Sequence, residues 1–238
     1  MQMIPKPFDS SAAIAQEYKD YAYIVSHDLS APARAIVEFS QLLQNEESGS
    51  LTEDAKLYLT MVMENGKKLQ SMLAALLAYS RVDTSAKLPT SVDTQQIIEE
   101  CCAALPQQGI KIDCQNLPIL QADVDQVRQL FTALIGNSIK FIAPGQSPHI
   151  KILSRPEEQT WHFIVEDNGI GINPKFHERI FQVFQRLHTD NEYPGVGMGL
   201  ALAKKIVTRH GGKIWVEPSE LGGTAFHFIL SNKNMGLC

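Results

Sequence analysis

The first eighty residues place apolar side chains three and four positions apart, the spacing of amphipathic helices. From Ser11 to Gln44 there is no glycine and a single proline, Pro32, which predicts a first long helix. The tract Asn45–Ser50 has the composition of a turn, and a second helix is predicted from Leu51 to about Arg81. The apolar stripe of the second helix consists of Leu59, Val62, Met63, Leu69, Met72, Leu73, Leu76 and Leu77. Two long helices joined by a short turn predict an antiparallel hairpin.

A helical hairpin of this kind leaves its apolar stripe uncovered. At 1.5 Å per residue each helix is ~45 Å long, and one helix pair has little else to bury. Two hairpins packed as a four-helix bundle solve this problem. We therefore expect the leucines of the stripe to form a core and a homodimer interface.

The pattern changes after Val82, where a short linker over residues 83–90 precedes alternating helix and strand patterns. We predict helices at Thr94–Ala104, Val124–Phe141 and Leu200–His210. We predict strands at Ile150–Ser154, Trp161–Glu166, Lys213–Glu217 and Thr224–Leu230. This order favours a sheet layered against helices over a doubly wound parallel sheet. The domain prediction is a helical hairpin over residues 1–82, a linker over 83–90 and an α/β domain over 91–238.

Composition narrows the class of protein without naming a function. The 238 residues carry a net charge of −5, which argues against nucleic-acid binding by bulk positive charge. There is no apolar run of the ~18 residues that a membrane span needs, and no signal-peptide pattern, so we expect a cytoplasmic protein. The four cysteines have no paired spacing, which argues against a zinc site or a disulfide framework.

The first candidate for chemistry is His27, which is followed directly by Asp28 on the first predicted helix. A nearby carboxylate can keep one imidazole nitrogen protonated, so that the other is a free nucleophile. Adjacent helical residues point in different directions, however, and a lone helical histidine is more often an ordinary surface or core residue. The pair on its own therefore leaves both interpretations open.

The second candidate is the pair Asn137 and Lys140, three residues apart on a helix whose other face is apolar. This spacing lets both polar groups project together. An amide oxygen can bind magnesium, and an ammonium group can meet phosphate oxygens. An ordinary amphipathic helix would show the same pattern.

Two glycine-rich segments complete the set of candidates. In the first, a predicted strand leads into Asp167, Gly169 and Gly171. Glycines allow the backbone to approach a ligand closely, and the carboxylate can accept a hydrogen bond from an amine. The alternative is a plain glycine turn. In the second, Gly195, Gly197 and Gly199 open a helix whose first N–H groups could bind an anion.

The order of these features resembles the transmitter core of two-component sensor histidine kinases, from about Glu17 to Leu230. The matching segments are an H box (Ser26–Pro32), an N box (Asn137–Phe141), a first glycine box (Asp167–Gly171), a phenylalanine box (Ile180–Leu187), a second glycine box (Gly195–Leu200) and a closing Gly222–Phe226. The stretch Phe181–Val216 is most similar to the phytochrome-like branch.

The resemblance implies a dimeric histidine-bearing hairpin followed by an α/β sandwich of the Bergerat type that binds ATP and Mg²⁺. It implies that His27 is phosphorylated with help from Asp28. It implies that Asn137 holds magnesium, that Lys140 contacts phosphate and that Asp167 receives the adenine amine. The other cofactor-binding positions that it implies are Gly169, Gly171, Gly195, Gly197, Gly199 and Thr224.

The resemblance also implies partners and a moving segment. The phosphoryl group would pass from the histidine to an aspartate of a response-regulator receiver domain. The residues His188–Pro194 would form a short ATP lid. Because only about a dozen residues precede the first helix, we expect either a fragment of a longer sensor or a signal that arrives from a separate protein.

Three positions depart from the family pattern. Ala133 stands where the family has an asparagine four residues before the magnesium asparagine, and Val196 replaces a threonine of the second glycine box. Ala31 stands where strong phosphatases carry threonine or asparagine, which implies weak phosphatase activity. Ala133 also argues against the gyrase- and chaperone-like ATPases, which carry a catalytic glutamate there. The remaining alternative is a dimeric phosphotransfer or scaffold protein with a degenerate ATP site.

Overall fold

The structure, a computed structural model, describes residues 29–45, 51–85, 87–103, 105, 109–189 and 192–231. The predicted acceptor His27 and its neighbour Asp28 lie outside these residues. The chain divides into two compact units, Met1–Arg81 and Val82–Cys238. Within the described residues, no helix is both long enough and apolar enough to cross a membrane.

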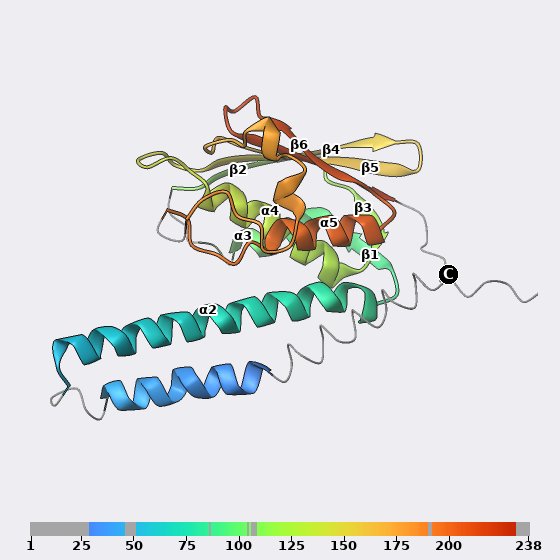
Figure 1. The fold of residues 1–238 in the computed structure, drawn as a ribbon. Coiled ribbons are helices and arrows are strands. Elements are labelled where there is room, and N and C mark those ends of the chain that lie inside the picture. The colour runs from blue at the N-terminus through green and yellow to red at the C-terminus, as the bar shows by residue number, and fades with distance from the viewer. Residues whose placement is uncertain are drawn as a thin grey trace, which may run out of the picture. The chain divides into compact units, whose positions relative to one another are not determined.

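The first unit contains two helices of the predicted hairpin, whereas residues 11–28 of the predicted first helix and residues 46–50 of the predicted turn lie outside the described residues. Residues 29–45 are helical, and α2 spans Glu53–Thr84, so that its last turn extends into the second unit (Figure 1). The hydroxyl of Thr52 accepts from the N–H of Ala55 at 3.2 Å and begins α2. The two helices approach closely at Gly66, where a Cβ would lie 2.5 Å from Cγ2 of Val37. The lack of a side chain at Gly66 therefore allows the helices to pack.

The second unit is built on a mixed sheet of five strands in the order β2–β4–β5–β7–β6. Its strands are β2 (Lys111–Gln115), β4 (His149–Glu157), β5 (Thr160–Asp167), β6 (Ile214–Pro218) and β7 (Thr224–Ser231). Among these described strands β2 and β4 pair in parallel, and the other neighbours are antiparallel. A separate antiparallel pair joins β1 (Thr90–Asp93) to β3 (Ile119–Ala122).

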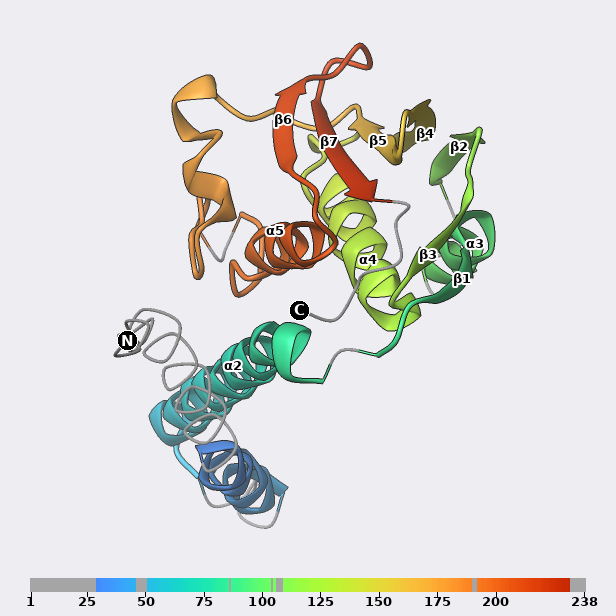
Figure 2. The same cartoon turned by 90° about the vertical axis from the view of Figure 1, so that its right-hand side faces the viewer.

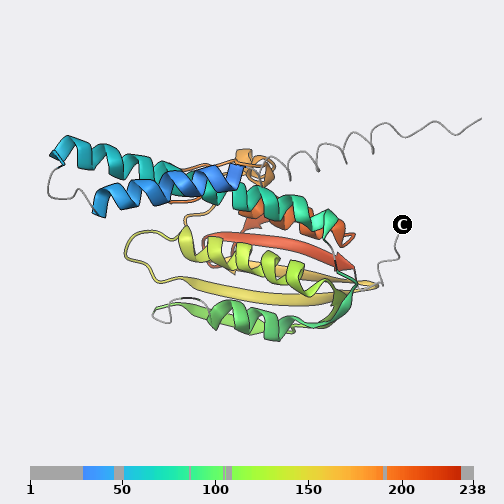
Figure 3. The same cartoon turned by 90° about the horizontal axis from the view of Figure 1, so that it is seen from below.

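Helices cover one face of the five-stranded sheet. These are α3 (Thr94–Ala103), α4 (Val124–Lys140) and α5 (Gly199–Arg209), with α4 in the middle (Figures 2 and 3). Two short 3₁₀ helices, Pro174–Phe176 and Arg179–Phe181, lie in the connection between β5 and α5. The predicted layering of a sheet against helices is confirmed, and the doubly wound alternative is excluded.

Three phenylalanines hold α4 on the sheet. Phe131 of α4 meets Phe163 of β5 and Phe228 of β7 edge-on, with ring centroids 5.8 and 5.7 Å apart. The two strand residues stack with their centroids 5.0 Å apart, and all three side chains are fully buried. Each such side chain stabilises the fold by ~1.5–3 kcal/mol through burial, which fixes the position of the helix that carries Asn137 and Lys140.

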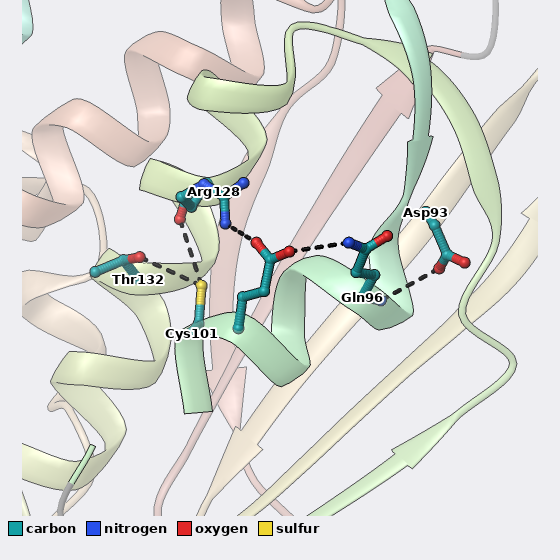
Figure 4. Close-up of polar contacts among 6 residues, drawn as sticks. Asp93, Gln96, Cys101, Arg128 and Thr132 are labelled. Atoms are coloured by element: carbon teal, nitrogen blue, oxygen red, sulfur yellow. Dashed lines mark hydrogen bonds and ion pairs between the residues drawn. The ribbon is translucent and has the colours of Figure 1, made fainter. Parts of the chain in front are cut away.

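A polar network fixes α3 against α4 (Figure 4). The carboxylate of Glu100 pairs with Arg128 and also accepts from Nε2 of Gln96 at 3.0 Å. These contacts lower the pKa of Glu100, since the Arg128 guanidinium favours the charged carboxylate. Thr132 lies one turn beyond Arg128 on α4, and its Oγ1 is 3.4 Å from Sγ of Cys101 on α3. The α3–α4 layer is therefore held by polar contacts at its rim as well as by its core.

Cys101, Cys102 and Cys114 are free thiols. Burial, followed by the proximity of Cys114, raises the pKa of Cys102 to about 11. This thiol is thus protonated at neutral pH, in keeping with a packing role.

We expect His210 to make the second unit sensitive to acid. His210 is buried at the end of α5, with Nδ1 2.9 Å from the carbonyl of Ile206 and Nε2 3.4 Å from the N–H of Asp123. Because Nε2 must accept from Asp123, the proton is on Nδ1 and the ring is neutral. Burial lowers the pKa of His210, so the unfolded chain binds this proton more readily than the folded one.

Stability from this group is therefore present above the unfolded pKa of about 6.5 and declines below it, by up to ~1.4 kcal/mol per pH unit. Urea unfolding at pH 7.5 and 5.5 checks this, because His210→Gln keeps a donor and an acceptor but cannot titrate. We expect the variant to lose less stability on acidification than the wild type. Equal losses would contradict the assignment.

Candidate functional site

Asp167 ends β5 in a buried position and is held by donors from three elements. Its Oδ1 accepts from the backbone N–H groups of Gly169 and Thr224, both at 2.9 Å. Its Oδ2 lies 3.2 Å from the hydroxyl of Ser138 on α4. Burial raises the pKa of Asp167, and these three hydrogen bonds oppose that rise. A carboxylate oxygen has two lone pairs, so Oδ2 retains one acceptor position for a ligand donor.

The backbone around Asp167 is so close that only glycine fits at two positions. A Cβ at Gly223 would lie 2.3 Å from the nitrogen of Gly169 and 2.4 Å from Oδ1 of Asp167. A Cβ at Gly169 would lie 2.4 Å from the carbonyl oxygen of Phe141, which accepts from the N–H of Ile170 at 2.9 Å. The two glycines thus bring the start of β7, the loop after β5 and the end of α4 together.

Asn168 stabilises this loop rather than facing the site. Its Oδ1 accepts from the N–H of His149 at 2.8 Å, and its Nδ2 donates to the carbonyl of Ser147 at 3.0 Å. The loop after β5 is thereby tied to the first residue of β4. Gly171 follows with φ of +71° and lies close to Gly223. From the sequence alone, Asn168 is one residue of the first glycine box. In the structure its side chain links the end of β5 to the start of β4.

Lys140 and the second glycine-rich segment lie side by side. A Cβ at Gly195 would lie 2.7 Å from Nζ of Lys140, so this ammonium group contacts the backbone there. Nζ also lies 4.5 Å from the ring centroid of Phe141. Asn137 lies one turn earlier on α4 and is partly exposed. The structure therefore brings the N-box helix and the segment around Gly195 to one place.

The same segment leads into the N-terminus of α5. Gly197 has φ of +77°, and a Cβ there would lie 2.7 Å from the carbonyl oxygen of Gln185. Gly199 begins α5 opposite Ala133 of α4, since a Cβ at Gly199 would lie 3.8 Å from the Cβ of Ala133. Among the described residues no side chain caps α5. Its first N–H groups are oriented to bind an anion, and the helix dipole favours negative charge there.

An aromatic cluster anchors both ends of the segment predicted as a lid. The ring of Tyr193 lies 5.0 Å from that of Phe141 and 5.1 Å from that of His188, measured between centroids. The hydroxyl of Tyr193 donates to the carbonyl of Ile142 at 3.2 Å. Residues 190 and 191, between these anchors, are outside the described part of the chain. The described ends of the segment are thus fixed against the end of α4.

The arrangement has the donors and acceptors that a nucleotide with a metal ion needs. A buried acceptor, Asp167, contacts α4, which also carries the cation Lys140 and faces the start of α5 at Gly199. In the described residues no cluster of three histidine, cysteine or acidic side chains could hold a metal ion. Magnesium commonly uses one or two protein oxygens and completes its shell with water and phosphate, so an amide such as that of Asn137 suits it.

Ser138 was not singled out from the sequence, and we expect its removal to weaken nucleotide binding. Ser138→Ala deletes the donor to Oδ2 of Asp167 while leaving the fold intact. We expect affinity for ATP to fall about fivefold, which corresponds to ~1 kcal/mol. A fluorescent ATP analogue measures this. Ser154→Ala is the matched control, since Ser154 is equally buried but donates to the carbonyl of Asn116. Unchanged affinity in Ser138→Ala would contradict the role.

Comparisons with known proteins find relatives of the whole chain and of its second unit. The sequence profile of the "Histidine kinase-, DNA gyrase B-, and HSP90-like ATPase" family matches residues 122–234. The chain is 42% identical over 90% of its length to the phytochrome-like protein Cph1 of Synechocystis, of which it spans 29%. It is 31% identical over 90% of its length to the adaptive-response sensory kinase SasA of a Synechococcus strain, of which it spans 59%.

A solved structure with a similar fold is that of full-length ShkA in complex with AMPPNP. It superposes with a TM-score of 0.64 and 26% identity, covering 92% of this chain and 47% of ShkA. The fold over the described residues, a helical region followed by a mixed α/β sheet domain, is therefore shared with ShkA.

Proposed function

We propose that this chain, whose residues 122–234 belong to the histidine kinase-, DNA gyrase B- and HSP90-like ATPases, is the kinase region of a sensor histidine kinase. It would transfer a phosphoryl group from ATP to His27 and then to an aspartate of a response regulator. The observation that carries this proposal is the meeting of α4 with both glycine-rich segments, at Asp167 and at Lys140. The similarity to Cph1 and SasA, which extends over both units, supports it.

The site around Asp167 fits the adenine ring of ATP. The remaining lone pair on Oδ2 can accept from an exocyclic amine, and Ser138 and Thr224 hold the carboxylate in place. Guanine carries a carbonyl where adenine carries this amine, so two acceptors would face each other. We propose that Asp167, with Gly169, Gly171 and Thr224 as its supports, selects ATP.

The site around Lys140 fits the phosphates. Lys140 would neutralise phosphate charge, and the N–H groups at Gly195, Gly197 and Gly199 would bind phosphate oxygens. Asn137 would supply a magnesium ligand, and the metal's contribution is neutralisation of the charge that develops on the phosphates. Phosphoryl transfer depends mainly on such positioning and neutralisation, so this set of groups meets its needs.

The acceptor role rests on the sequence, because His27 and Asp28 are outside the described residues. An imidazole nitrogen is a competent nucleophile near neutral pH, since its free pKa is about 6.5. We propose that Asp28 keeps the other nitrogen of His27 protonated while the free nitrogen attacks the γ-phosphorus, so that an N–P bond forms as the bond from this phosphorus to the bridging oxygen breaks and ADP leaves. The sequence-based division into a phosphoacceptor hairpin (1–82), a linker (83–90) and an ATP-binding domain (91–238) belongs to the same proposal, with residues 83 and 84 of the linker forming the end of α2 and grouped with the second unit.

The described part of the hairpin leaves many large apolar side chains exposed. They include Leu29, Ile36, Phe39, Leu42, Leu43, Leu57, Tyr58, Met61, Val62 and Leu69. An exposed apolar surface of this extent on one hairpin marks an interaction site. We propose that two copies of the chain pack these surfaces together in a four-helix bundle.

Incubation with radiolabelled ATP and Mg²⁺ tests the proposal. We expect acid-labile, base-stable label in the wild type and none in His27→Gln or Asn137→Ala. His162→Gln is the matched control, because His162 lies on the sheet beside His227. We expect this variant to be labelled like the wild type. Label that persists in His27→Gln would overturn the acceptor assignment. Nucleotide binding without any label in the wild type would favour the alternative of a scaffold protein with a degenerate ATP site. Ala133 and Val196, which depart from the family pattern at that site, are the residues that suggest this alternative.

A further inference from the structure

The last turn of α2 belongs to the ATP-binding unit. The boundary between the two units falls between Arg81 and Val82, inside α2, rather than in the loop that follows it. Val82 is 2% exposed and is part of the core of the second unit. Its carbonyl accepts from Nε2 of the buried Gln126 on α4 at 2.9 Å. The end of α2 is therefore anchored on α4.

Asp83 adds a second anchor, on α5. Its carboxylate lies 3.2 Å from Nζ of Lys205 and 3.9 Å from Nη1 of Arg209. The side chains are mostly buried, with 26% of Asp83 and 14% of Lys205 exposed. Ion pairs that are partly withdrawn from water are screened less than surface pairs and hold their geometry better.

The connecting loop is fixed at its far end as well. The N–H of Lys87 donates to Oδ2 of Asp123 at 2.8 Å, and its Nζ lies 2.5 Å from Oδ2 of Asp125. The other oxygen of Asp123 caps α4 through the N–H groups of Asp125 and Gln126. The end of the connection at Val82 and Asp83 is thus attached to α4 and α5, and the end at Lys87 is attached to the start of α4.

The helix that Asp83 contacts also carries the nucleotide site. α5 begins at Gly199, in the second glycine-rich segment, and ends at Arg209 beside Asp83. Eleven residues at 1.5 Å each make it a rigid element ~16 Å long. Asp83 therefore connects the end of α2 to the same helix whose start is placed to bind phosphate.

We propose that Asp83 is a positioning residue that clamps the last turn of α2 to α5, so that the two units pivot within α2 near Arg81 and not in the connection between α2 and β1. This inference rests on the proposed transfer to His27. With the clamp closed, the flexible connection between the units is short. The effective concentration of the ATP site at the acceptor histidine therefore stays high. With the clamp open, additional residues become flexible and that concentration falls.

Asp83→Asn in the full chain tests the clamp by two independent measurements. Hydrogen exchange reports on the peptide covering residues 82–89, where we expect at least tenfold faster exchange in the variant. Autophosphorylation kinetics report on transfer, where we expect kcat to fall about tenfold while KM for ATP and the dissociation constant of a fluorescent ATP analogue stay within twofold. Asp83→Glu, which keeps the charge, should recover most of the rate.

Lys205→Gln opens the same clamp from α5 and should reproduce both effects, which guards against misfolding of one variant. Asp113→Asn is the matched control, since Asp113 pairs with Lys111 and His149 at β2, away from α2. Unchanged exchange over 82–89, or an unchanged kcat, in folded Asp83→Asn would overturn the clamp. A wild type that never labels His27 would instead overturn the proposed function, and the exchange measurement would still show whether the clamp exists.

Discussion

Asp167→Asn is expected to lower ATP affinity about 100-fold, the equivalent of ~2.8 kcal/mol. In the wild type, Oδ1 accepts two backbone N–H groups and Oδ2 is left to meet the adenine amine. In the variant the amide oxygen takes the place of Oδ1, because the two N–H donors need an acceptor. The amide NH₂ group then faces the adenine amine, so that two donors oppose each other in a buried site.

Titration with a fluorescent ATP analogue measures this loss, and circular dichroism verifies the fold. Glu166→Gln is the matched control, because Glu166 is the neighbouring buried carboxylate on β5 and points to the opposite face of the sheet. We expect its affinity to remain within twofold of the wild type. Affinity within a few-fold of the wild type in a folded Asp167→Asn protein would refute the assignment of this carboxylate to adenine.

Gly223→Ala is expected to destabilise the second unit by about 3 kcal/mol and to weaken ATP binding along with it. The added methyl group would lie 2.3 Å from the nitrogen of Gly169 and 2.6 Å from the carbonyl oxygen of Asp167. These are backbone atoms, so no side chain can turn aside to make room. The strand start of β7 has to move away from the loop after β5, which displaces the N–H of Thr224 from Asp167.

Urea unfolding measures the stability, and the analogue titration measures the affinity. Gly136→Ala is the control, because among the described residues no atom beyond the neighbouring residues and backbone of its own helix lies within 4 Å of a Cβ there, and the residue is inside α4. We expect Gly136→Ala to stabilise the protein by ~0.5–1 kcal/mol through lower backbone entropy in the unfolded chain. A Gly223→Ala protein as stable as the wild type would mean that the crowding around Asp167 is relieved by a small local shift.

The long elements could be predicted from local pattern because each carries its own signal. α2 and α4 show helical spacing over several turns, and the structure places α4 at Val124–Lys140 against a prediction of Val124–Phe141. The strands β4 and β5 extend beyond the predicted Ile150–Ser154 and Trp161–Glu166, since the hairpin joining them pairs their ends as well. The apolar residues that predict β4 and β5 lie only in the part of each strand that is covered by the helices.

The strands β1, β2 and β3 were missed for a physical reason. They are only four or five residues long, and β2 reads Lys-Ile-Asp-Cys-Gln, with too few apolar positions to stand out. β2 is formed by parallel pairing with β4, and β1 by pairing with β3. A strand of this kind exists because a distant partner supplies its hydrogen bonds, and no local window contains that partner.

The sequence by itself was enough to predict the helical hairpin and the alternation of helices and strands. It also showed the spacing of Asn137, Lys140, Asp167 and the glycines. Those features are local, because they follow from the period of a helix or strand and from the lack of a side chain at glycine. Only the tertiary structure decided that Ser138 donates to Asp167, that Gly223 lies against Gly169 and that Asp83 pairs with Lys205. Each of these contacts joins residues far apart in the chain, and packing of the core around Phe131 brings them within reach.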